Sequence, residues 1–147
     1  MSSAAIRIDF YVLEQAEPAA RLRLACRLME KALQHRHRVH ALTTDERDAH
    51  DLDELLWTFR AESFVPHALD TNSAARDVPV TIGWNEQAAG HDADLLINLT
   101  PTVPPCFDTY QRVIEIVDAS DDGRRDGRER FRFYRENGLE PQTHRIA

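Results

Sequence analysis

The sequence predicts an α/β domain of three layers, in which helices cover both faces of a largely parallel central sheet. Short runs rich in β-branched and apolar residues alternate with helical patterns along the chain. The run LLINL at 95–99 is apolar enough for a strand that is buried on both faces of such a sheet. A length of 147 residues fits one domain, 1–147, with a single core.

The first half of the chain predicts a βαβα unit. Residues 6–13 form the first expected strand, and Pro18, a favourable first-turn residue, begins a helix that extends to about His35. A second short strand is expected at 38–42, and Thr44 is the expected N-cap of the next helix. Apolar residues at helical spacing support both helices: Leu22, Ala25, Cys26, Met29 and Leu33 in the first, and Leu52, Leu55, Leu56 and Phe59 in the second.

The second half adds three expected strands, at 79–84, 95–99 and 113–117. The proline-marked segment before the last of them is expected to form a loop with a short helix. Ser120 then caps a final helix that ends at Gly138 in the C′ position.

Composition limits the possible partners and locations. The formal net charge of −7 and the isoelectric point of about 5.4 argue against general nucleic-acid binding, which requires a broad basic surface. No secretion signal or membrane span is recognisable, so a cytoplasmic protein without membrane contact is predicted. Cys26 and Cys106 lack CxxC spacing, and Cys26 lies in a helical pattern where a buried thiol is expected.

The first strand-to-helix turn argues against a nucleotide site. It runs from Leu13 to Pro18 and contains two glutamates but neither glycine nor lysine. A phosphate needs close backbone approach and amide donors there, which glycines provide. We therefore expect a nucleotide-binding-like topology without a phosphate loop, and no cofactor.

Two groups of metal-ligating residue types have simpler interpretations. His35, His37 and His40 surround a helix end, where cations interact favourably with the helix dipole. The second group consists of three aspartates and lies where a helix N-terminus favours negative charge, although carboxylates of this kind can also hold magnesium. With these interpretations no metal site is predicted. No catalytic residues are predicted either, since nucleophile motifs are absent. The second group comprises Asp118, Asp121 and Asp122.

The most distinctive segment is Gly123 to Gly138, which holds six of the eighteen basic residues of an acidic chain. Its six arginines stand against three acidic residues, so the local charge is +3. On a helix, Arg124, Arg128 and Arg135 share one narrow sector, and Gly127 and Tyr134 share another that is expected to pack on the sheet. Arg–Glu pairing on a solvated face, for example of Glu129 with Arg132 and Arg125, is the alternative to a binding surface for an acidic peptide.

A second candidate surface lies in the segment LDELLWTFRAESFVPH, which runs from Leu52 to His67. Trp57, Phe59 and Phe64 are three large aromatic residues in eight positions. The sequence alone slightly favours the core for all three. Pro66 and the neighbouring charges make an exposed, partner-binding position for Trp57 and Phe64 the alternative.

These segments and their spacing resemble the chi subunit of bacterial DNA polymerase III over nearly the full chain. The resemblance is carried by LDELLWTF followed by ESFVPH, and by FYVL, HRV, PVTIGW, DLLINL, VIEIVD and GRERFRFYRENG. It implies a non-catalytic accessory protein of the clamp-loader complex, with an α/β fold that binds no nucleotide. It further implies two partners, the psi subunit and the acidic C-terminal tail of single-stranded DNA-binding protein, so that DNA is reached only indirectly.

The resemblance also implies where these partners bind. The psi subunit is expected at Trp57, Phe64 and Pro66, a surface that in some relatives serves a helicase. Two other functions are alternatives to this accessory role: a nucleotide-dependent α/β enzyme, and direct binding of single-stranded DNA by the Arg-rich helix. The tail is expected at Arg124, Arg128, Phe131, Arg132 and Arg135, with Val117 as an apolar neighbour.

Overall fold

The computed structural model describes residues 6–60, 64–72, 75, 77–85 and 93–146, in which seven strands form one sheet of order β3-β4-β2-β5-β6-β1-β7. Every strand pair is parallel, which confirms the predicted sheet. The strands are β1 (Arg7–Leu13), β2 (Val39–Leu42), β3 (His67–Leu69), β4 (Val80–Gly83), β5 (Leu95–Asn98), β6 (Arg112–Val117) and β7 (Gln142–Ile146). The helices are α1 (Pro18–Gln34), α2 (Glu46–Thr58), α3 (Asp121–Glu136) and the short 3-10 helix η3 (Pro105–Thr109).

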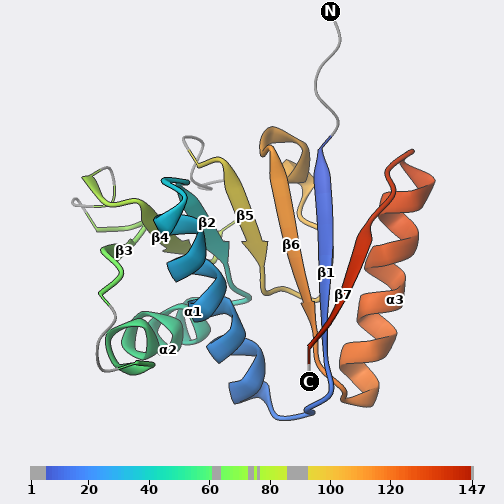
Figure 1. Cartoon of the computed structure of the whole chain (residues 1–147), viewed down its shortest axis with the longest axis horizontal. Coiled ribbons are helices and arrows are strands. Elements are labelled where there is room, and N and C mark those ends of the chain that lie inside the picture. Colours follow the sequence, from blue (N-terminus) through green and yellow to red (C-terminus); the bar gives the residue numbers. More distant parts are fainter. Residues whose placement is uncertain (1–5, 61–63, 73–74, 76, 86–92, 147) are drawn as a thin grey trace, which may run out of the picture.

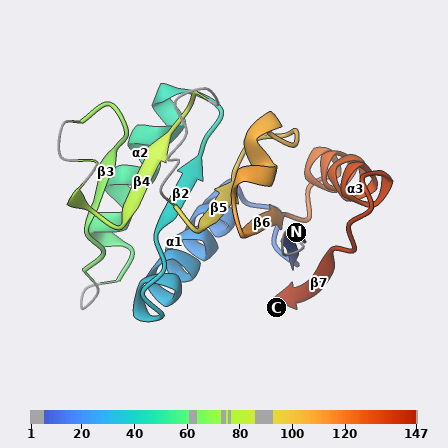
Figure 2. The ribbon, with the colours of Figure 1, turned by 90° about the horizontal axis from the view of Figure 1, so that it is seen from above.

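Helices cover both faces of the sheet, as the apolar strands predict. Helices α1 and α2 pack on one face and α3 on the other, beside β1 and β7 (Figures 1 and 2). Alternation along β1 assigns its side chains to the two cores, because Ile8 and Phe10 face α3 whereas Leu13 faces α1. All four residues of β5 are buried, in agreement with a strand covered on both faces.

The helix ends follow the sequence signals at three positions and depart from them at one. Pro18 begins α1, Ser120 caps α3 by accepting from the amide of Gly123 at 3.0 Å, and Gly138 adopts a positive φ of 81° after α3. The prediction of Thr44 as the cap of α2 is wrong. The cap is Asp45, whose carboxylate accepts from the amide of Asp48 at 2.9 Å, an arrangement that a carboxylate favours at a helix N-terminus.

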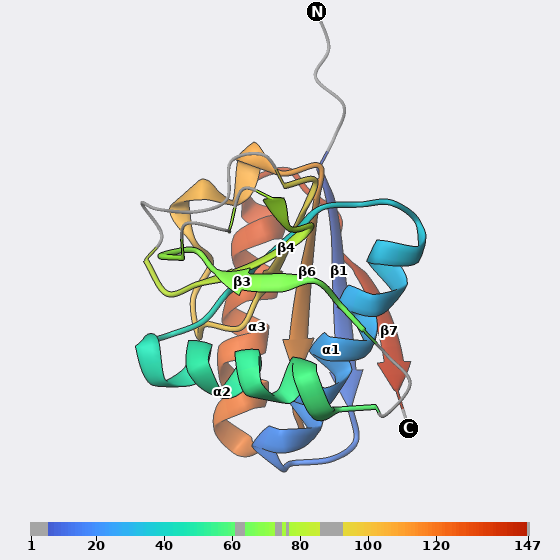
Figure 3. The same ribbon diagram turned by 90° about the vertical axis from the view of Figure 1, so that its left-hand side faces the viewer.

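Two strands, β3 and β7, are absent from the sequence prediction. They form the two edges of the sheet, β3 beside β4 and β7 beside β1. Figure 3 shows β3 in front, with α2 crossing below it. Because β3 has three residues and β7 exposes polar residues at alternate positions, neither carries the apolar run that marks a central strand.

No helix in the described residues combines the length and the apolar character that crossing a membrane requires.

Candidate functional site

Helix α3 packs unusually close to the sheet at one glycine. A Cβ atom on Gly127 would lie 2.8 Å from Cγ2 of Val117 on β6, closer than carbon atoms approach in folded proteins. Gly127 and Tyr134 are both buried, as the helical periodicity predicts. The missing side chain therefore sets the distance between α3 and the strand whose end carries Val117.

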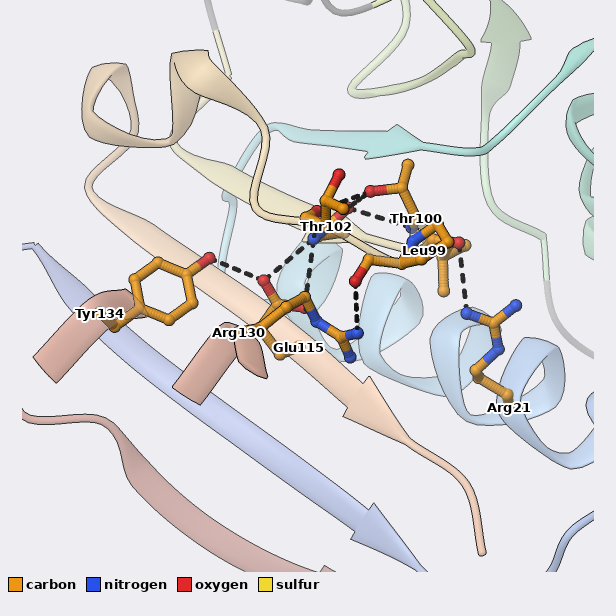
Figure 4. A network of polar contacts seen from close by, with 9 residues as sticks. Arg21, Leu99, Thr100, Thr102, Glu115, Arg130 and Tyr134 are labelled. Carbon is orange, nitrogen blue, oxygen red and sulfur yellow. Dashed lines mark hydrogen bonds and ion pairs between the residues drawn. The ribbon is translucent and has the colours of Figure 1, made fainter. Parts of the chain in front are cut away.

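A buried polar network fixes the same helix. The Nε atom of Arg130 donates to Glu115 Oε1 at 2.7 Å, the Tyr134 hydroxyl donates to Oε2 at 2.6 Å, and Asn98 donates to the same carboxylate (Figure 4). Arg130 also donates to the carbonyl of Pro101. Burial raises the pKa of the Glu115 carboxyl, and the charge of Arg130 with the three donors opposes that shift. Arg130 therefore stabilises the packing of α3 on the sheet and is not free to bind a ligand. The other five arginines of the basic segment lie outside this network.

A groove between α3 and the sheet edge brings together four of the residues that the resemblance implies for tail binding. We call it the inner groove, and its volume is about 550 Å³. Strand β1 supplies an apolar floor, and β7 supplies the wall opposite α3. The implied residues that line it are Val117, Arg124, Arg128 and Phe131, joined by Phe10, Val12, Leu13, Glu14, Gly127, Thr143 and Arg145.

A second groove, the outer groove, continues along α3 with a volume of about 530 Å³. It is lined by Arg128, Phe131, Arg132, Arg135 and Glu136. Arg128 and Phe131 line both grooves, so they stand where the two meet. All six residues assigned to tail binding therefore lie on one continuous surface.

The arginines of these grooves have few acidic partners. In the described part of the chain, Arg124, Arg128 and Arg135 are exposed and form no ion pair with a carboxylate. Arg132 approaches Glu129 at 3.7 Å, one of the pairs that the alternative interpretation expects. An exposed pair of this kind contributes little, about 0–1 kcal/mol, and leaves Arg132 available to a ligand.

Arg125 is different, because it lines neither groove. It pairs with Asp122 at 3.1 Å and with Asp126 at 3.3 Å, and the expected pair with Glu129 is not formed. The helix therefore has one arginine paired on its solvated side and a row of arginines that face the grooves.

Trp57 and Phe64 form a separate aromatic patch. The exposed fractions of Trp57 and Phe64 are 57% and 68%, so the core position that the sequence slightly favoured is wrong for both. Phe59, in contrast, is partly buried against the core, and Pro66 is half-buried. The ring centroid of Trp57 lies 6.0 Å from that of Phe64 and 4.7 Å from that of buried His67, so the Trp57 ring packs on His67 at the surface.

The crevice at the carboxyl ends of β5 and β6 is where α/β sheets commonly bind ligands. Here it holds a cavity of about 190 Å³, lined by Arg21 and Arg130 together with three aspartates. Both guanidinium groups already donate to main-chain carbonyls, Arg21 to that of Leu99 at 3.2 Å (Figure 4). The aspartates, which would repel a phosphate, are Asp118, Asp122 and Asp126.

Across the described ranges, no three or more histidine, cysteine, aspartate or glutamate side chains are placed to hold a metal ion together. One oxygen of Asp118 accepts from the amide and hydroxyl of Ser120, so it organises the start of α3. His40 is buried whereas His37 is exposed, so these two histidines near the end of α1 do not face a common site.

Comparison with known proteins places this geometry in a family. The family model described as "DNA polymerase III chi subunit, HolC" matches residues 6–142. The chain belongs to this family. It is 44% identical over 140 residues to DNA polymerase III subunit chi of Pseudomonas aeruginosa, with 95% of this chain and 96% of the relative covered. It is 32% identical over 120 residues to the subunit chi of Escherichia coli, covering 82% of each chain.

Two further residues of the inner groove of this chi-family chain, Thr143 and Arg145, were not predicted from the sequence. They lie on β7, which was itself missed, so nothing connected them with α3. The signal that could have found them is the alternation of QTHRI, in which Thr143 and Arg145 share one face. Arg130 was likewise unassigned, because its partner Glu115 lies on another element.

Proposed function

We propose that this chi-family chain is a non-catalytic accessory subunit of DNA polymerase III that binds the acidic C-terminal tail of single-stranded DNA-binding protein. The observation that carries the proposal is the meeting of two arginine-lined grooves at Arg128 and Phe131. Through that tail the clamp-loader complex would be linked to coated single-stranded template, and the chain would reach DNA only indirectly.

The chemistry of the grooves supports a carboxylate-bearing peptide. A guanidinium group binds a carboxylate through two parallel hydrogen bonds, and such charge-assisted bonds are about twice as strong as neutral ones. Phe131 is half-buried against Phe10, with ring centroids 5.2 Å apart, and presents an apolar surface beside the arginines. Arg128 would bind the terminal carboxylate or an acidic side chain while Phe131 contacts an aromatic residue of the tail.

Arg128→Ala tests the tail site. We expect the affinity for an acidic peptide with a C-terminal aromatic residue to fall by about 2 kcal/mol or more, roughly thirtyfold, as for a central interface residue. Calorimetry at two salt concentrations measures the loss. Affinity of the native chain should fall steeply with salt, because exposed charges are screened over about 8 Å at physiological ionic strength.

Arg125→Ala is the matched control, since it removes the same charge from the same helix but lines neither groove. It should bind the peptide as the native chain does. Equal affinities of native protein and folded Arg128→Ala would refute the tail site. Tighter binding of a naked oligonucleotide than of the peptide would favour direct DNA binding.

The Trp57 patch is proposed as the binding surface for the psi subunit. Its two exposed aromatic rings carry no charge, unlike the arginines of the α3 grooves, and Pro66 lies two residues beyond Phe64 in the chain. Tryptophan is enriched among the residues that dominate interface energies. A helicase that uses the same surface is the alternative partner.

Trp57→Ala should weaken psi binding by about 2 kcal/mol or more and leave the peptide affinity unchanged. Because Trp57 is more than half exposed, its removal should change the free energy of unfolding by less than about 1 kcal/mol. Phe133→Ala, which removes an exposed aromatic residue of α3, is the control. Full psi binding by Trp57→Ala, measured by pull-down and calorimetry, would exclude this surface.

The crevice at the ends of β5 and β6 supports a non-catalytic function. Its two guanidinium groups are engaged by main-chain carbonyls, and its aspartates disfavour a phosphate. A nucleotide is therefore not expected to raise the melting temperature, whereas a ligand at 100 times its dissociation constant would add about 2.7 kcal/mol to the stability.

A further inference from the structure

We propose that strand β7 is a second binding wall for the acidic peptide, and that Arg145 on this strand binds one of its acidic side chains. The inference rests on the proposed function, because it places the same peptide between α3 and β7. Arg145 and Thr143 line the inner groove opposite Arg124 and Arg128. A peptide in this groove would have guanidinium groups on both sides.

The register of the sheet explains why Arg145 faces the groove. Strand β7 pairs with β1 in parallel, with Thr143 beside Phe10 and Arg145 beside Val12. Phe10 and Val12 point toward α3, and neighbours in register point to the same side of a sheet. The alternate residues of β7 face α1: His144 stacks on Tyr11 with ring centroids 4.7 Å apart, and Ile146 packs against the α1-side core.

The charges of the inner groove favour an acidic occupant. Three guanidinium groups, of Arg124, Arg128 and Arg145, line it against a single carboxylate, that of Glu14. Arg145 is exposed and has no ion pair within the described residues. The floor of Phe10 and Val12 is apolar, which suits a peptide with apolar side chains better than a nucleic-acid backbone. The net charge of −7 also disfavours nucleic acid.

The test compares Arg145→Ala with Arg23→Ala in calorimetric titrations with the acidic peptide. Arg23 is an exposed arginine of α1 outside both grooves, so its removal controls for net charge. We expect Arg145→Ala to weaken binding by about three- to tenfold, the range for a partly exposed charge pair. Arg145→Glu should weaken it further, Arg145→Lys should restore part of the affinity, and Arg23→Ala should match the native chain.

Peptides in which the acidic residues are replaced by amides one at a time identify the contact. For one of these peptides, Arg145→Ala should cause no additional loss, since its partner is already absent. Equal binding by Arg145→Ala and Arg23→Ala, while Arg128→Ala loses binding, would overturn the role of β7 and leave the tail site intact. Undiminished binding by Arg128→Ala would instead overturn the proposed function. A loss of oligonucleotide binding alone in Arg145→Ala would also overturn the inference.

Discussion

The two walls of the inner groove are attached to the sheet in different ways. Helix α3 is anchored from beneath by the buried ion pair of Arg130 with Glu115 and by close packing at Gly127. Strand β7 is one edge of the sheet and is attached by main-chain pairing with β1, by a contact of His144 with Asp9 at 2.8 Å and by the packing of Ile146 on the α1-side core. The side chains of the first anchor are 6% and 0% exposed, whereas the side chain of His144 is 35% exposed.

One groove thus combines a wall on a helix held by a buried ion pair with a wall on an edge strand held by a part-exposed contact. The buried network sets the position of the α3 backbone before any ligand arrives, so binding must order only the exposed arginine side chains. The position of Arg145 depends instead on an edge strand whose side-chain contact, between His144 and Asp9, is partly exposed. Breaking each anchor in turn should therefore give effects of different size and different pH dependence.

The largest effect is expected from Arg130→Ala. Removing one partner of a buried ion pair leaves the other without compensation, which costs about 3–5 kcal/mol. Urea unfolding followed by circular dichroism measures this loss. Arg128→Ala, on the same helix but exposed, should change the free energy of unfolding by no more than about 0.5 kcal/mol.

A double variant separates the charge from the packing. Glu115→Gln combined with Arg130→Met removes the buried charge together with its partner, and the amide oxygen can still accept from Tyr134. Most of the stability should return. If Arg130→Ala cost less than about 1 kcal/mol, the buried network would not be the anchor of α3.

Sequence patterns were informative where an element carries its own signal. The periodicity of α3 predicted which arginines share a face and that Gly127 and Tyr134 face the sheet, and the apolar strand at 95–99 predicted the layered fold. Both follow from local spacing of 3.6 or 2 residues. The caps at Ser120 and Gly138 were predicted for the same reason.

The features that the sequence did not predict depend on distant partners. In the sequence, Arg130 cannot be distinguished from the other arginines of α3, because its partner Glu115 lies on β6. Likewise, β7 is a polar segment that only its pairing with β1 identifies as a strand. The exposure of Trp57 and Phe64 depends on how α2 meets β3. A large aromatic residue has the same local pattern whether it enters the core or a partner surface.

A smaller and pH-dependent effect is expected at the anchor of β7, from Asp9→Asn. Burial opposes ionisation of Asp9, but hydrogen bonds from His144 and Arg112 and the charges of Arg112 and Arg7 outweigh it and lower the pKa of this carboxyl. The stabilisation is therefore present above the unfolded-state pKa of about 3.9 and is lost as the pH falls through the lower folded-state pKa. At pH 7 the variant should be less stable by about 1–3 kcal/mol, the range for hydrogen bonds to a charged group.

Urea unfolding of the native chain and Asp9→Asn between about pH 7 and pH 3 measures this difference. It should shrink below about pH 4, where the unfolded chain takes up a proton at Asp9 before the folded chain does. Asp51→Asn, at an exposed position of α2, removes the same charge and is the control. A difference that stayed constant to the lowest pH would show that Asp9 contributes packing alone. A difference that shrinks there would show that the ionised carboxylate of Asp9, with its hydrogen bonds from His144 and Arg112, supplies the stability that the variant lacks at pH 7.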